Sequence, residues 1–534
     1  MDNQGVIRSA GRVSFFILVS RAFGLIRDMA MAALFGSSLA MDAFVVAFTI
    51  PNLFRNLFGE GALSAAFVPV FTETLEKQGR DVVWRFAQKM MSLLGLTLAG
   101  LVLAGILAAG AWQMLFPLSP RGTLILVLLQ IMLPYMFFIC LAAYFSAMLN
   151  TLRHFALPAS TPVILNLVMI AVLFLVCPLL EAEGRLRIVV VAWSVVLAGA
   201  AQWLIQLPLL WRYGFRLRLS FDWHDTRVRR VIQLMSIAII GTGMTQISVL
   251  LDRFVAIFLG PGSASYLYYA ERLIYFPLGL FATALGTVLL PTFSGHAAQA
   301  RTDRIRETLN QALRQLMFIM LPAAVGLMAL AQPIVRLLYE RGDFAPQATA
   351  MTALAVQCYA PGLLIFSLLK VLVPVFHAHQ DMRTPMRISV ACTGFNMVLK
   401  LFLILVWQWR PFAYAHAFVA AATVLASAVA VLALGLLAQR RWGSCGWRTI
   451  GLASVKMLAA ALIMAVAART VYQNILTNSW LAAGAWQAQL LAILGALGTG
   501  IVVYGSLAML GRFPEVYEFW QAIRHRRQPE QAAQ

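Results

Sequence analysis

The sequence predicts an all-α polytopic membrane protein, and three observations lead to this fold class. The 534-residue chain is 61% hydrophobic and only 12% charged, with a mean hydropathy of +0.81, whereas soluble domains are about half apolar and about a quarter charged. Its apolar stretches recur at a length of about 20 residues, which is the length a helix needs to cross a bilayer. They lack the short alternating segments typical of a membrane β-barrel.

We expect about fourteen transmembrane helices, because the chain contains about that number of apolar runs of sufficient length. Turn-forming residues separate them, among them GSS at 36–38 and PGS at 261–263. The predicted spans are 13–35, 41–71, 86–116, 122–149, 158–180, 188–211, 232–259, 264–294, 309–331, 350–376, 385–408, 413–438, 450–472 and 484–510. An even number of spans places both termini on the same side of the membrane.

The distribution of basic residues predicts that this side is the cytoplasm. If the N-terminus is cytoplasmic, the loops on that side and both tails hold far more Lys and Arg than the opposite side, as the positive-inside rule requires. The net charge of +20 could also indicate nucleic-acid binding. However, the basic residues are scattered through short loops, so we expect no nucleic-acid partner. Examples are Lys77, Arg80, Arg85, Arg212, Arg216, Arg218, Arg227, Arg229, Arg230, Arg301, Arg304, Arg306, Arg440, Arg441, Arg448, Arg524, Arg526 and Arg527.

The chain also resembles itself at a distance of about 225 residues, which indicates an internal repeat. AAFVPVFTE around Pro69 recurs as TVLLPTFSG around Pro291, LPYMFF at Pro134 recurs as APGLLIF at Pro361, and RHFALPA at 153–159 recurs as QDMRTPM at 380–386. Repeats with an even number of spans face the same way, so we expect two pseudo-symmetric six-helix lobes around a central cavity, plus two C-terminal helices. The predicted domains are an N-terminal lobe at 1–211 (helices 1–6), a cytoplasmic inter-lobe loop at 212–231, a C-terminal lobe at 232–440 (helices 7–12), and two additional helices with a cytoplasmic tail at 441–534.

Charged residues interrupt the first two predicted spans. A charge near the bilayer centre costs about 2.5–3.5 kcal/mol, so several in one hydrophobic hairpin need a functional explanation. Arg21 and Asp28 are seven residues apart and share a helix face. Arg55 follows Pro51, and a helix weakened by proline at membrane depth is tolerated where it borders protein or water. We therefore expect that this hairpin borders a water-filled cavity. Its polar candidates are Arg21, Arg27, Asp28, Asp42, Asn52, Arg55 and Glu60.

The second lobe carries its own polar set. Basic residues outnumber acidic ones in this set, whereas a neutral network that only joins helices would need near-equal numbers. Guanidinium groups bind phosphate and pyrophosphate in bidentate fashion, so surplus arginine favours an anionic ligand. The second set comprises Asp252, Arg253, Ser265, Tyr268, Tyr269, Arg272 and Lys370.

Some of these residues have a second interpretation. Arg27–Asp28 and Asp252–Arg253 are equally compatible with structural ion pairs or interfacial anchors, and Glu271 beside Arg272 is similar. Asp42 lies near the turn between the first two spans, so the sequence favours a solvated position for it over a position in the cavity.

No pattern in the sequence is typical of an enzyme. His154, His377 and His379 lie near predicted cytoplasmic turns without an HExxH or clustered-carboxylate motif, and no P-loop is present. The five cysteines show neither metal-binding nor disulfide spacing. The RGD at 341–343 is expected to be a turn. Internal symmetry with a charged midline favours a secondary transporter without a metal or cofactor, and leaves coupling to Na⁺ or to the membrane potential open.

Several motifs resemble those of a known family. SRAFGLIRDMAMAALFG, MDAFVVAF and PNLFRNLFGEGALSAAFVPVF look like the N-terminal signature of the MurJ (MviN) family of lipid II flippases, in the multidrug/oligosaccharidyl-lipid/polysaccharide (MOP) exporter superfamily. YYAERLIYFPLGLFATALGTVLLPTFS at 268–294 and VFHAHQDMRTP at 375–385 resemble later family segments. The resemblance covers essentially the whole chain. It implies a monomer in the bacterial inner membrane, among phospholipids, that moves undecaprenyl-pyrophosphate-linked peptidoglycan precursor (lipid II) from the cytoplasmic to the periplasmic leaflet by alternating access.

The resemblance also implies roles for individual residues. The substrate-binding residues would be Arg21, Arg27, Arg55, Arg272, Asn52 and Ser265, and the supporting or gating residues would be Asp28, Asp42, Glu60, Asp252, Arg253 and Lys370. The last two helices would form a groove for the lipid tail. Family members often carry an acid where this chain has Tyr275, so the role of that acid does not transfer.

Two alternatives stay open at this point. One is another flippase of lipid-linked oligosaccharides, of the O-antigen type, and the other is a membrane enzyme acting on polyprenyl-phosphate sugars. A drug exporter of the same superfamily is disfavoured, because surplus arginine in the cavity would repel cationic drugs.

Overall fold

The structure of the chain is a computed structural model that describes residues 3–57, 63–180, 184–299, 301–409, 413–444, 446–478 and 486–516. These residues are almost entirely helical and include no strand, which confirms the predicted all-α fold class. The chain divides into two compact units. Unit 1 contains Met1–Ser265 and Arg341–Ala345, and unit 2 contains Tyr266–Glu340 and Pro346–Gln534. The predicted lobe boundary at 212–231 rests on the repeat pattern and stays a prediction.

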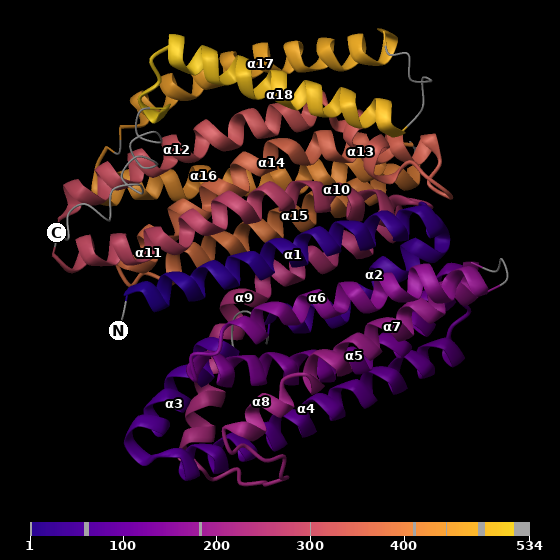
Figure 1. The fold of residues 1–534 in the computed structure, drawn as a ribbon, viewed down its shortest axis with the longest axis vertical. Helices are drawn as coiled ribbons and strands as arrows, with labels where there is room; N and C mark the ends of the chain where they lie inside the picture. Colours follow the sequence, from indigo (N-terminus) through magenta and orange to yellow (C-terminus); the bar gives the residue numbers. More distant parts are fainter. Residues whose placement is uncertain are drawn as a thin grey trace. The chain divides into compact units, whose positions relative to one another are not determined.

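Unit 1 is built from the helices drawn in indigo to magenta in Figure 1. The long helix α5 packs against α2, α4 and α7, while α1 packs on α6, and α9 packs on α2 and α3. The bounds are α1 (Asn3–Phe35), α2 (Leu39–Arg55), α3 (Leu63–Gln78), α4 (Arg80–Leu115), α5 (Pro120–Thr151), α6 (Ala156–Ala171) with a π-helical turn (Val172–Val176) and a 3₁₀ turn (Cys177–Leu179), α7 (Gly184–Leu204), α8 (Leu207–Arg212) and α9 (Thr226–Phe258).

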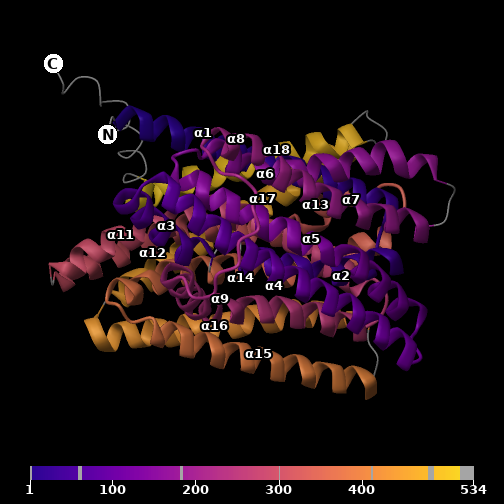
Figure 2. The ribbon, with the colours of Figure 1, turned by 90° about the horizontal axis from the view of Figure 1, so that it is seen from below.

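Unit 2 contains the remaining helices, of which α10 begins at the end of unit 1. The helix α14 packs against α11, α12 and α16, and Figure 2 shows α15 running beside α16. The bounds are α10 (Ser263–Pro277), a π-helical turn (Leu278–Ala282), α11 (Thr283–Ala298), α12 (Thr302–Ala329), α13 (Ala331–Tyr339), α14 (Pro346–Ala378), α15 (Arg383–Trp409), α16 (Ala415–Trp442), α17 (Trp447–Asn478) and α18 (Trp486–Leu510).

Several helix starts follow directly from local sequence. The hydroxyl of Ser38 accepts a hydrogen bond from the backbone amide of Met41, and Ser119 caps α5 in the same way, with Pro120 at the first helical position. These side chains satisfy amides that a helix N-terminus leaves without partners, and proline lacks the amide that would be lost there. Asp225 caps α9 by accepting from the amide of Arg227.

In the described part of the chain, ten helices are individually long and apolar enough to span a membrane. The predicted total of about fourteen therefore stays a prediction. The predicted spans outside this group are 13–35, 41–71, 232–259 and 264–294, and these are the spans that the polar candidates interrupt, apart from Lys370. The last of them is broken by the π-helical turn after Pro277. Polar candidates thus concentrate in corresponding pairs of predicted spans in the two halves of the chain.

The helix ends repeat together with the sequence. The helices α5 and α14 contain Pro134 and Pro361, and each is followed by a non-glycine residue with positive φ, Arg153 (65°) and Gln380 (58°). At both ends the positive-φ residue donates to a carbonyl three residues earlier, and the next residue donates five residues back. This is the hydrogen-bond pattern of a Schellman motif. The two turns therefore support the repeat inferred from RHFALPA and QDMRTPM.

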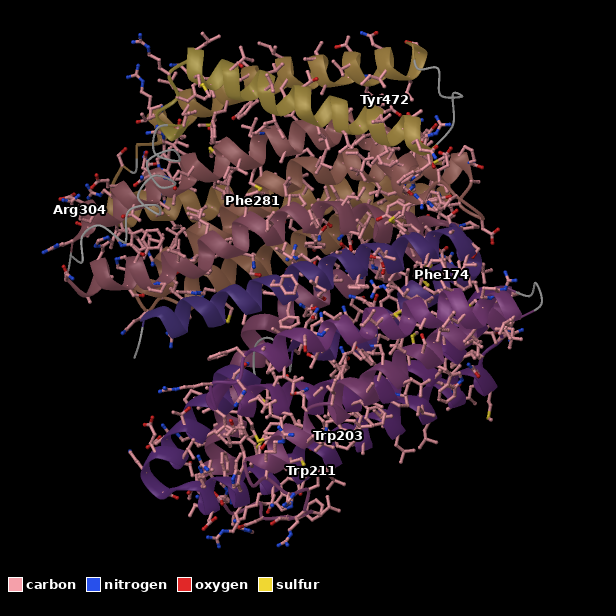
Figure 3. All side chains as sticks on the ribbon, viewed as in Figure 1. Phe174, Trp203, Trp211, Phe281, Arg304 and Tyr472 are labelled. Carbon is pink, nitrogen blue, oxygen red and sulfur yellow. The ribbon has the colours of Figure 1, made fainter. Side chains whose placement is uncertain are left out.

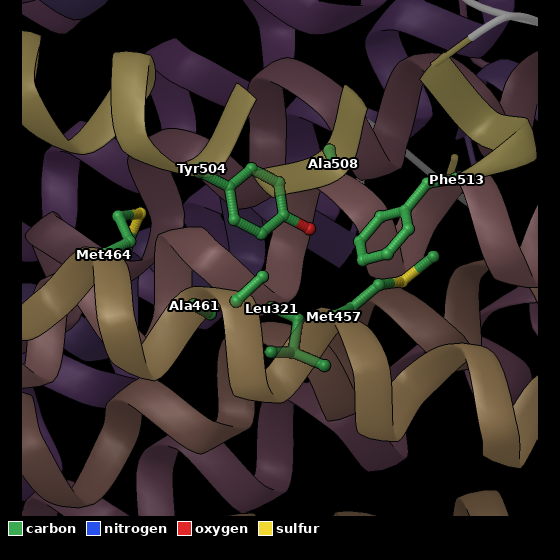
Figure 4. Packing of buried hydrophobic residues seen from close by; sticks show 8 residues of the cluster. Leu321, Met457, Ala461, Met464, Tyr504, Ala508 and Phe513 are labelled. Atoms are coloured by element: carbon green, nitrogen blue, oxygen red, sulfur yellow. The ribbon is translucent and has the colours of Figure 1, made fainter. Parts of the chain in front are cut away.

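Each unit has a core of interlocking side chains. In unit 1, Phe67 of α3 stacks on Phe86 of α4 and packs at a tilt against Tyr144 of α5, with ring centroids 5.7 and 4.7 Å away. In unit 2 the paired helices α17 and α18 pack on α12, and Figure 4 shows Leu321, Met457 and Tyr504 meeting there. The two C-terminal helices are thus an integral part of unit 2.

The predicted turn at 341–343 lies in the segment Arg341–Ala345, which belongs to unit 1. The amide of Asp343 donates to the carbonyl of Ala33 at 2.9 Å. Gly342 has a φ of +56°, and a Cβ there would lie 2.1 Å from the Ala33 oxygen, so only glycine fits. Gly36 has a φ of +53° and meets the carbonyl of Asp343 in the same way. This segment is a closely packed turn.

Candidate functional site

Arg27 and Asp28 form a buried ion pair where α1 packs on α6. Nη2 of Arg27 lies 2.7 Å from Oδ1 of Asp28, and the two side chains are 8% and 4% exposed. Nη1 of Arg27 donates to Oδ1 of Asn166 at 3.0 Å, while Nδ2 of Asn166 donates to the carbonyl of Ser20, also at 3.0 Å. This arrangement fits the structural interpretation of the pair. Arg21, two turns before Asp28 on α1, is only partly buried.

Arg55 is held in place by neutral amides at the end of α2. Its Nε donates to Oδ1 of Asn52 at 2.9 Å, and its Nη2 donates to Oδ1 of Asn56 at 2.7 Å. Nδ2 of Asn56 in turn donates to Oε1 of Gln246 on α9 at 3.1 Å. These bonds orient the partly buried guanidinium. The structure therefore brings together Arg55 and Asn52, as the sequence predicted.

Asp42 is fully buried, so the solvated position favoured by the sequence is wrong. Its Oδ2 lies 2.7 Å from Nη2 of Arg121 at the start of α5, and also accepts from the amide of Gly262 at 2.7 Å. Its Oδ1 accepts from the amide and hydroxyl of Ser265 at 2.9 and 2.7 Å. A carboxylate at these amides stabilises the N-terminus of α10. Asp42 is thus a cap supplied by another helix, and Ser265 is buried against it.

The charged pair on α9 is also buried. Asp252 and Arg253 are each 4% exposed within unit 1. Burial of two adjacent residues on one helix requires polar surroundings on more than one side, because their side chains point about 100° apart. Glu60, the remaining candidate of the first half, lies outside the described residues.

In unit 2, Arg272 is partly buried on α10 and interacts with Tyr268 one turn earlier. Nη2 of Arg272 donates to the Tyr268 hydroxyl at 3.1 Å, and its guanidinium carbon lies 4.7 Å from the centre of the Tyr268 ring. The neighbouring Glu271 accepts from the hydroxyl of Tyr359 on α14 at 3.2 Å. The polar stripe predicted on this helix is therefore divided: Tyr268 positions Arg272, whereas Glu271 links α10 to α14.

Lys370 is exposed within unit 2, on the helix α14 between Pro361 and Pro374. Beside it α11 approaches closely, because a Cβ on Gly286 would lie 3.2 Å from the carbonyl oxygen of Lys370. The structure thus leaves the Lys370 side chain accessible.

Sequence reasoning missed Arg121, which is partly buried, and Asn166 and Lys400, which are buried. Arg121 follows a proline at a span start and resembles an ordinary loop charge, and Asn166 is a single uncharged residue in an apolar run. Lys400 is 1% exposed on α15 and donates to Oγ1 of Thr423 on α16 at 2.9 Å. Its position inside an apolar span was the available signal, since a buried charge in a membrane helix marks a functional or structural site.

The described polar residues are suited to binding an anion. Arginine side chains only donate hydrogen bonds, and Arg55 and Arg272 donate to Asn52 and to the hydroxyl of Tyr268, respectively. Among the residues that the structure describes, no three His, Cys, Asp or Glu side chains lie together in a way that could hold a metal ion.

Comparison with known proteins agrees with a site for an anionic ligand. The family model of the lipid II flippase MurJ matches residues 31–488. A probable lipid II flippase MurJ from Vibrio cholerae is 34% identical over 517 residues, covering 95% of this chain and 96% of the relative. The lipid II flippase MurJ of Burkholderia cenocepacia is 34% identical over 396 residues, covering 72% of this chain and 76% of the relative.

Solved structures show the same fold. The lipid II flippase MurJ in an inward closed conformation matches with a TM-score of 0.73 and 26% identity, covering 93% of this chain and 99% of that chain. An inward-facing multidrug resistance MATE transporter of the MOP superfamily matches with a TM-score of 0.66 at 12% identity, covering 82% of this chain and 98% of that chain. The second likeness concerns the fold alone. By sequence and by structure, the chain belongs to the MurJ family of lipid II flippases.

Proposed function

We propose that this protein is a lipid II flippase, a transporter and not an enzyme. It moves the undecaprenyl-pyrophosphate-linked peptidoglycan precursor from the cytoplasmic to the periplasmic leaflet of the bacterial inner membrane, for cell-wall peptidoglycan synthesis. Membership of the MurJ family supports this assignment. The protein works as a monomer, with both termini in the cytoplasm and no resident cofactor.

The observation that carries the proposal is the way in which Arg55 is presented. Asn52 and Asn56 fix its orientation through neutral oxygens. A guanidinium held in a fixed orientation can bind a pyrophosphate with two parallel hydrogen bonds, which a lysine cannot do. Arg272, oriented by the ring and hydroxyl of Tyr268, serves the same ligand from the second half of the chain.

The remaining candidates divide by role. Arg21 is the further headgroup contact, while Arg27 positions α1 through Asp28 and Asn166 and adds positive potential to the cavity. Asp42 and Ser265 act as a gating pair, because they join α2 to the start of α10. Asn52 supports Arg55, and Glu60, Asp252, Arg253 and Lys370 support the cavity wall.

Transport follows an alternating-access cycle in which no covalent bond forms or breaks. The headgroup enters a cavity between the lobes from the cytoplasmic side, while the polyprenyl tail stays in lipid or on the last two helices. Rocking of the lobes then exposes the headgroup to the periplasm. The membrane potential can contribute about 2.3 kcal/mol per charge per 100 mV, which is enough to bias such a cycle.

The test is the charge-preserving substitution Arg55→Lys. Because the bidentate grip is lost, purified protein should bind lipid II on the order of tenfold more weakly, consistent with the strength of hydrogen bonds to charged groups. Flipping in proteoliposomes should fall in parallel. Arg85→Lys, an exposed arginine on α4, serves as the matched control and should leave both unchanged. Full binding and flipping by Arg55→Lys would exclude the bidentate grip.

A second experiment separates the proposal from the other lipid-linked oligosaccharides. Lipid II and an undecaprenyl-pyrophosphate carrying an unrelated oligosaccharide should compete for the purified protein, and lipid II should bind more tightly. Equal binding would favour a flippase of broader specificity.

A further inference from the structure

The loop between α8 and α9 is fixed along the outside of α4. Trp84, Gln88 and Ser92 of α4 lie at i, i+4 and i+8, so they form one face of the helix. Nε1 of Trp84 donates to the carbonyl of Tyr213 at 3.1 Å, and Nε2 of Gln88 donates to the carbonyl of Arg216 at 2.9 Å. Figure 1 shows this loop beside α8 and the start of α4.

The loop turns back where it reaches Ser92. The amide of Ser220 donates to Oγ of Ser92 at 2.9 Å, after which Nζ of Lys89 binds Asp222 and Asp225 at 2.7 and 3.0 Å. From Trp84 to Ser92 the loop follows α4 for about 12 Å, since a helix rises 1.5 Å per residue. The tip of the loop is at Ser220, after which the chain runs back along α4. At the base, the ring of Phe215 is fully buried, 5.6 Å from Trp84 and 5.7 Å from Phe145.

The charge pattern of α4 indicates that the tip lies at the level where the bilayer begins. After Lys89, α4 and the turn that follows it contain no charged residue until Arg121. This uncharged run is longer than the hydrocarbon core of about 30 Å requires, so Ser92, close to its start, is at the interface between headgroups and acyl chains. One turn further along α4, Leu96 is 55% exposed, as a side chain that faces lipid would be.

The tip itself is apolar on alternate residues. Leu217, Leu219, Phe221 and Trp223 are exposed by 40%, 77%, 54% and 55%. Arg216 lies directly before this row and Arg218 lies between Leu217 and Leu219, and both are exposed as well. Trp211, labelled in Figure 3 at the end of α8, is 43% exposed beside the same loop. Exposed leucine and aromatic side chains interleaved with arginine are what a surface needs to insert into a charged membrane interface.

We propose that the interfacial loop, residues 215–224, is a binding site for anionic phospholipid at the cytoplasmic surface of the membrane. Leu219 and Phe221 insert into the boundary between headgroups and acyl chains, and Arg216 and Arg218 bind lipid phosphates. The orientation rests on the proposed function, but the binding itself does not require transport. The loop is therefore a fixed membrane anchor of unit 1 and not a flexible linker.

Two observations favour lipid over a protein partner. First, the exposed apolar side chains of the loop lie beside the start of the exposed apolar face of α4, the face that we place in the membrane. Second, the positive charge of the arginines in the loop is complementary to anionic lipid headgroups. The hydrogen bonds that fix the loop come from its backbone and its acidic residues, so they leave the apolar and basic side chains directed outward.

Depth measurement tests the insertion. The five native cysteines are replaced by alanine, Leu219→Cys and, separately, Phe221→Cys carry a nitroxide label, and the full chain is reconstituted in vesicles of phosphatidylcholine with phosphatidylglycerol. We expect both labels to be accessible to oxygen and shielded from a water-soluble nickel complex. A label at Arg304→Cys, exposed on α12, should show the opposite. Aqueous accessibility at 219 and 221, or shielding from both reagents as in a protein contact, would overturn the proposal.

Hydrogen–deuterium exchange of the unmodified protein provides a test without substitutions in the loop. Amides at 216–224 should exchange more slowly in vesicles with phosphatidylglycerol than in phosphatidylcholine alone.

Substitution of the two arginines tests the contribution of charge. Each arginine near an anionic surface strengthens binding about fivefold, so Arg216→Gln with Arg218→Gln should lower the phosphatidylglycerol affinity on the order of twenty-five-fold. Arg301→Gln with Arg304→Gln, an equal loss of charge at exposed positions, should retain it. Equal losses in both double variants, or exchange independent of lipid charge, would contradict a specific site.

Discussion

Nη2 of Arg121 lies 2.7 Å from Oδ2 of Asp42, although 79 residues separate them along the chain. The carboxylate is fully buried, so loss of its cation leaves a buried negative charge. Arg121→Gln should therefore destabilise the protein by about 3–5 kcal/mol. Thermal unfolding in detergent would measure this as a large fall in midpoint. Arg121→Lys should recover part of the loss, whereas an unchanged midpoint in Arg121→Gln would show that the pair contributes nothing.

The bond between Arg27 and Asn166 gives a second stability prediction. Asn166→Leu removes a hydrogen bond to a charged group and another to the carbonyl of Ser20. We expect a loss of about 1.5–3 kcal/mol, seen as a lower unfolding midpoint. Thr97→Ala, on the exposed face of α4, should stay within about 0.5 kcal/mol of the parent. Equal behaviour of the two variants would refute the structural role of Asn166.

Tyr268 allows the two contacts of Arg272 to be separated. Tyr268→Phe keeps the ring beneath the guanidinium and removes only the hydroxyl acceptor. Lipid II binding should fall by about two- to fivefold, in line with a single modest hydrogen bond. Tyr268→Leu also removes the cation–π contact and should weaken binding further. Binding to the purified variants is measured alongside their unfolding midpoints, and a ranking of Leu above Phe would contradict this role of the ring.

Gly342 should tolerate no side chain. Gly342→Ala forces alanine into a left-handed conformation, which costs about 1–2 kcal/mol, and places its Cβ against the carbonyl of Ala33. Thermal unfolding should show clear destabilisation. Gly451→Ala on α17 is the matched control, since a Cβ there meets nothing within 4 Å and alanine favours a helix. A neutral Gly342→Ala would mean that the turn is free to move away from α1.

The ion pairs of Lys89 with Asp222 and Asp225, which fix the interfacial loop, should be insensitive to pH in the physiological range. Hydrogen bonding to Arg227, with a smaller contribution from Lys89, holds the pKa of Asp225 well below its ordinary value. A depressed carboxyl pKa stabilises the folded state above the unfolded pKa of about 3.9, and this stabilisation disappears as the pH falls through the folded pKa. The mobility of a nitroxide at position 219 should therefore stay constant from about pH 8 to pH 5, and rise only below about pH 4. Asp225→Asn should be mobile throughout, and a transition near neutrality would contradict the assignment.

The sequence predicted the fold well because one physical rule dominates it. Backbone groups in hydrocarbon must bond within the same helix, so apolar length alone identifies most spans. The repeat was equally readable, since Pro134 and Pro361 mark equivalent points in α5 and α14. Local pattern also identified Asn52 as a neighbour of Arg55, because three residues along a helix bring side chains together.

The environment of Asp42 could not be read in the same way. Its partners Gly262 and Ser265 are 220 and 223 residues away, and no local spacing encodes such a contact. Because Asp42 lies near a turn, the sequence indicated that its side chain is exposed to solvent. In the structure, packing of α2 and α5 against the start of α10 buries it. Asn166 was missed for a related reason. A single amide in an apolar run has no signature until its partner on α1 is known.

The turn at 341–345 also has a consequence for synthesis of the chain. Unit 1 contains Met1–Ser265, but its last segment is made only after most of α10–α13 has left the ribosome. At about 5–20 residues per second, the gap between residues 265 and 345 corresponds to roughly 4–16 s. During that interval the carbonyl of Ala33 lacks the amide of Asp343. Neither unit is a contiguous stretch of chain, so a truncation before residue 341 yields an N-terminal half without its closing turn, and insertion of the second half completes the first.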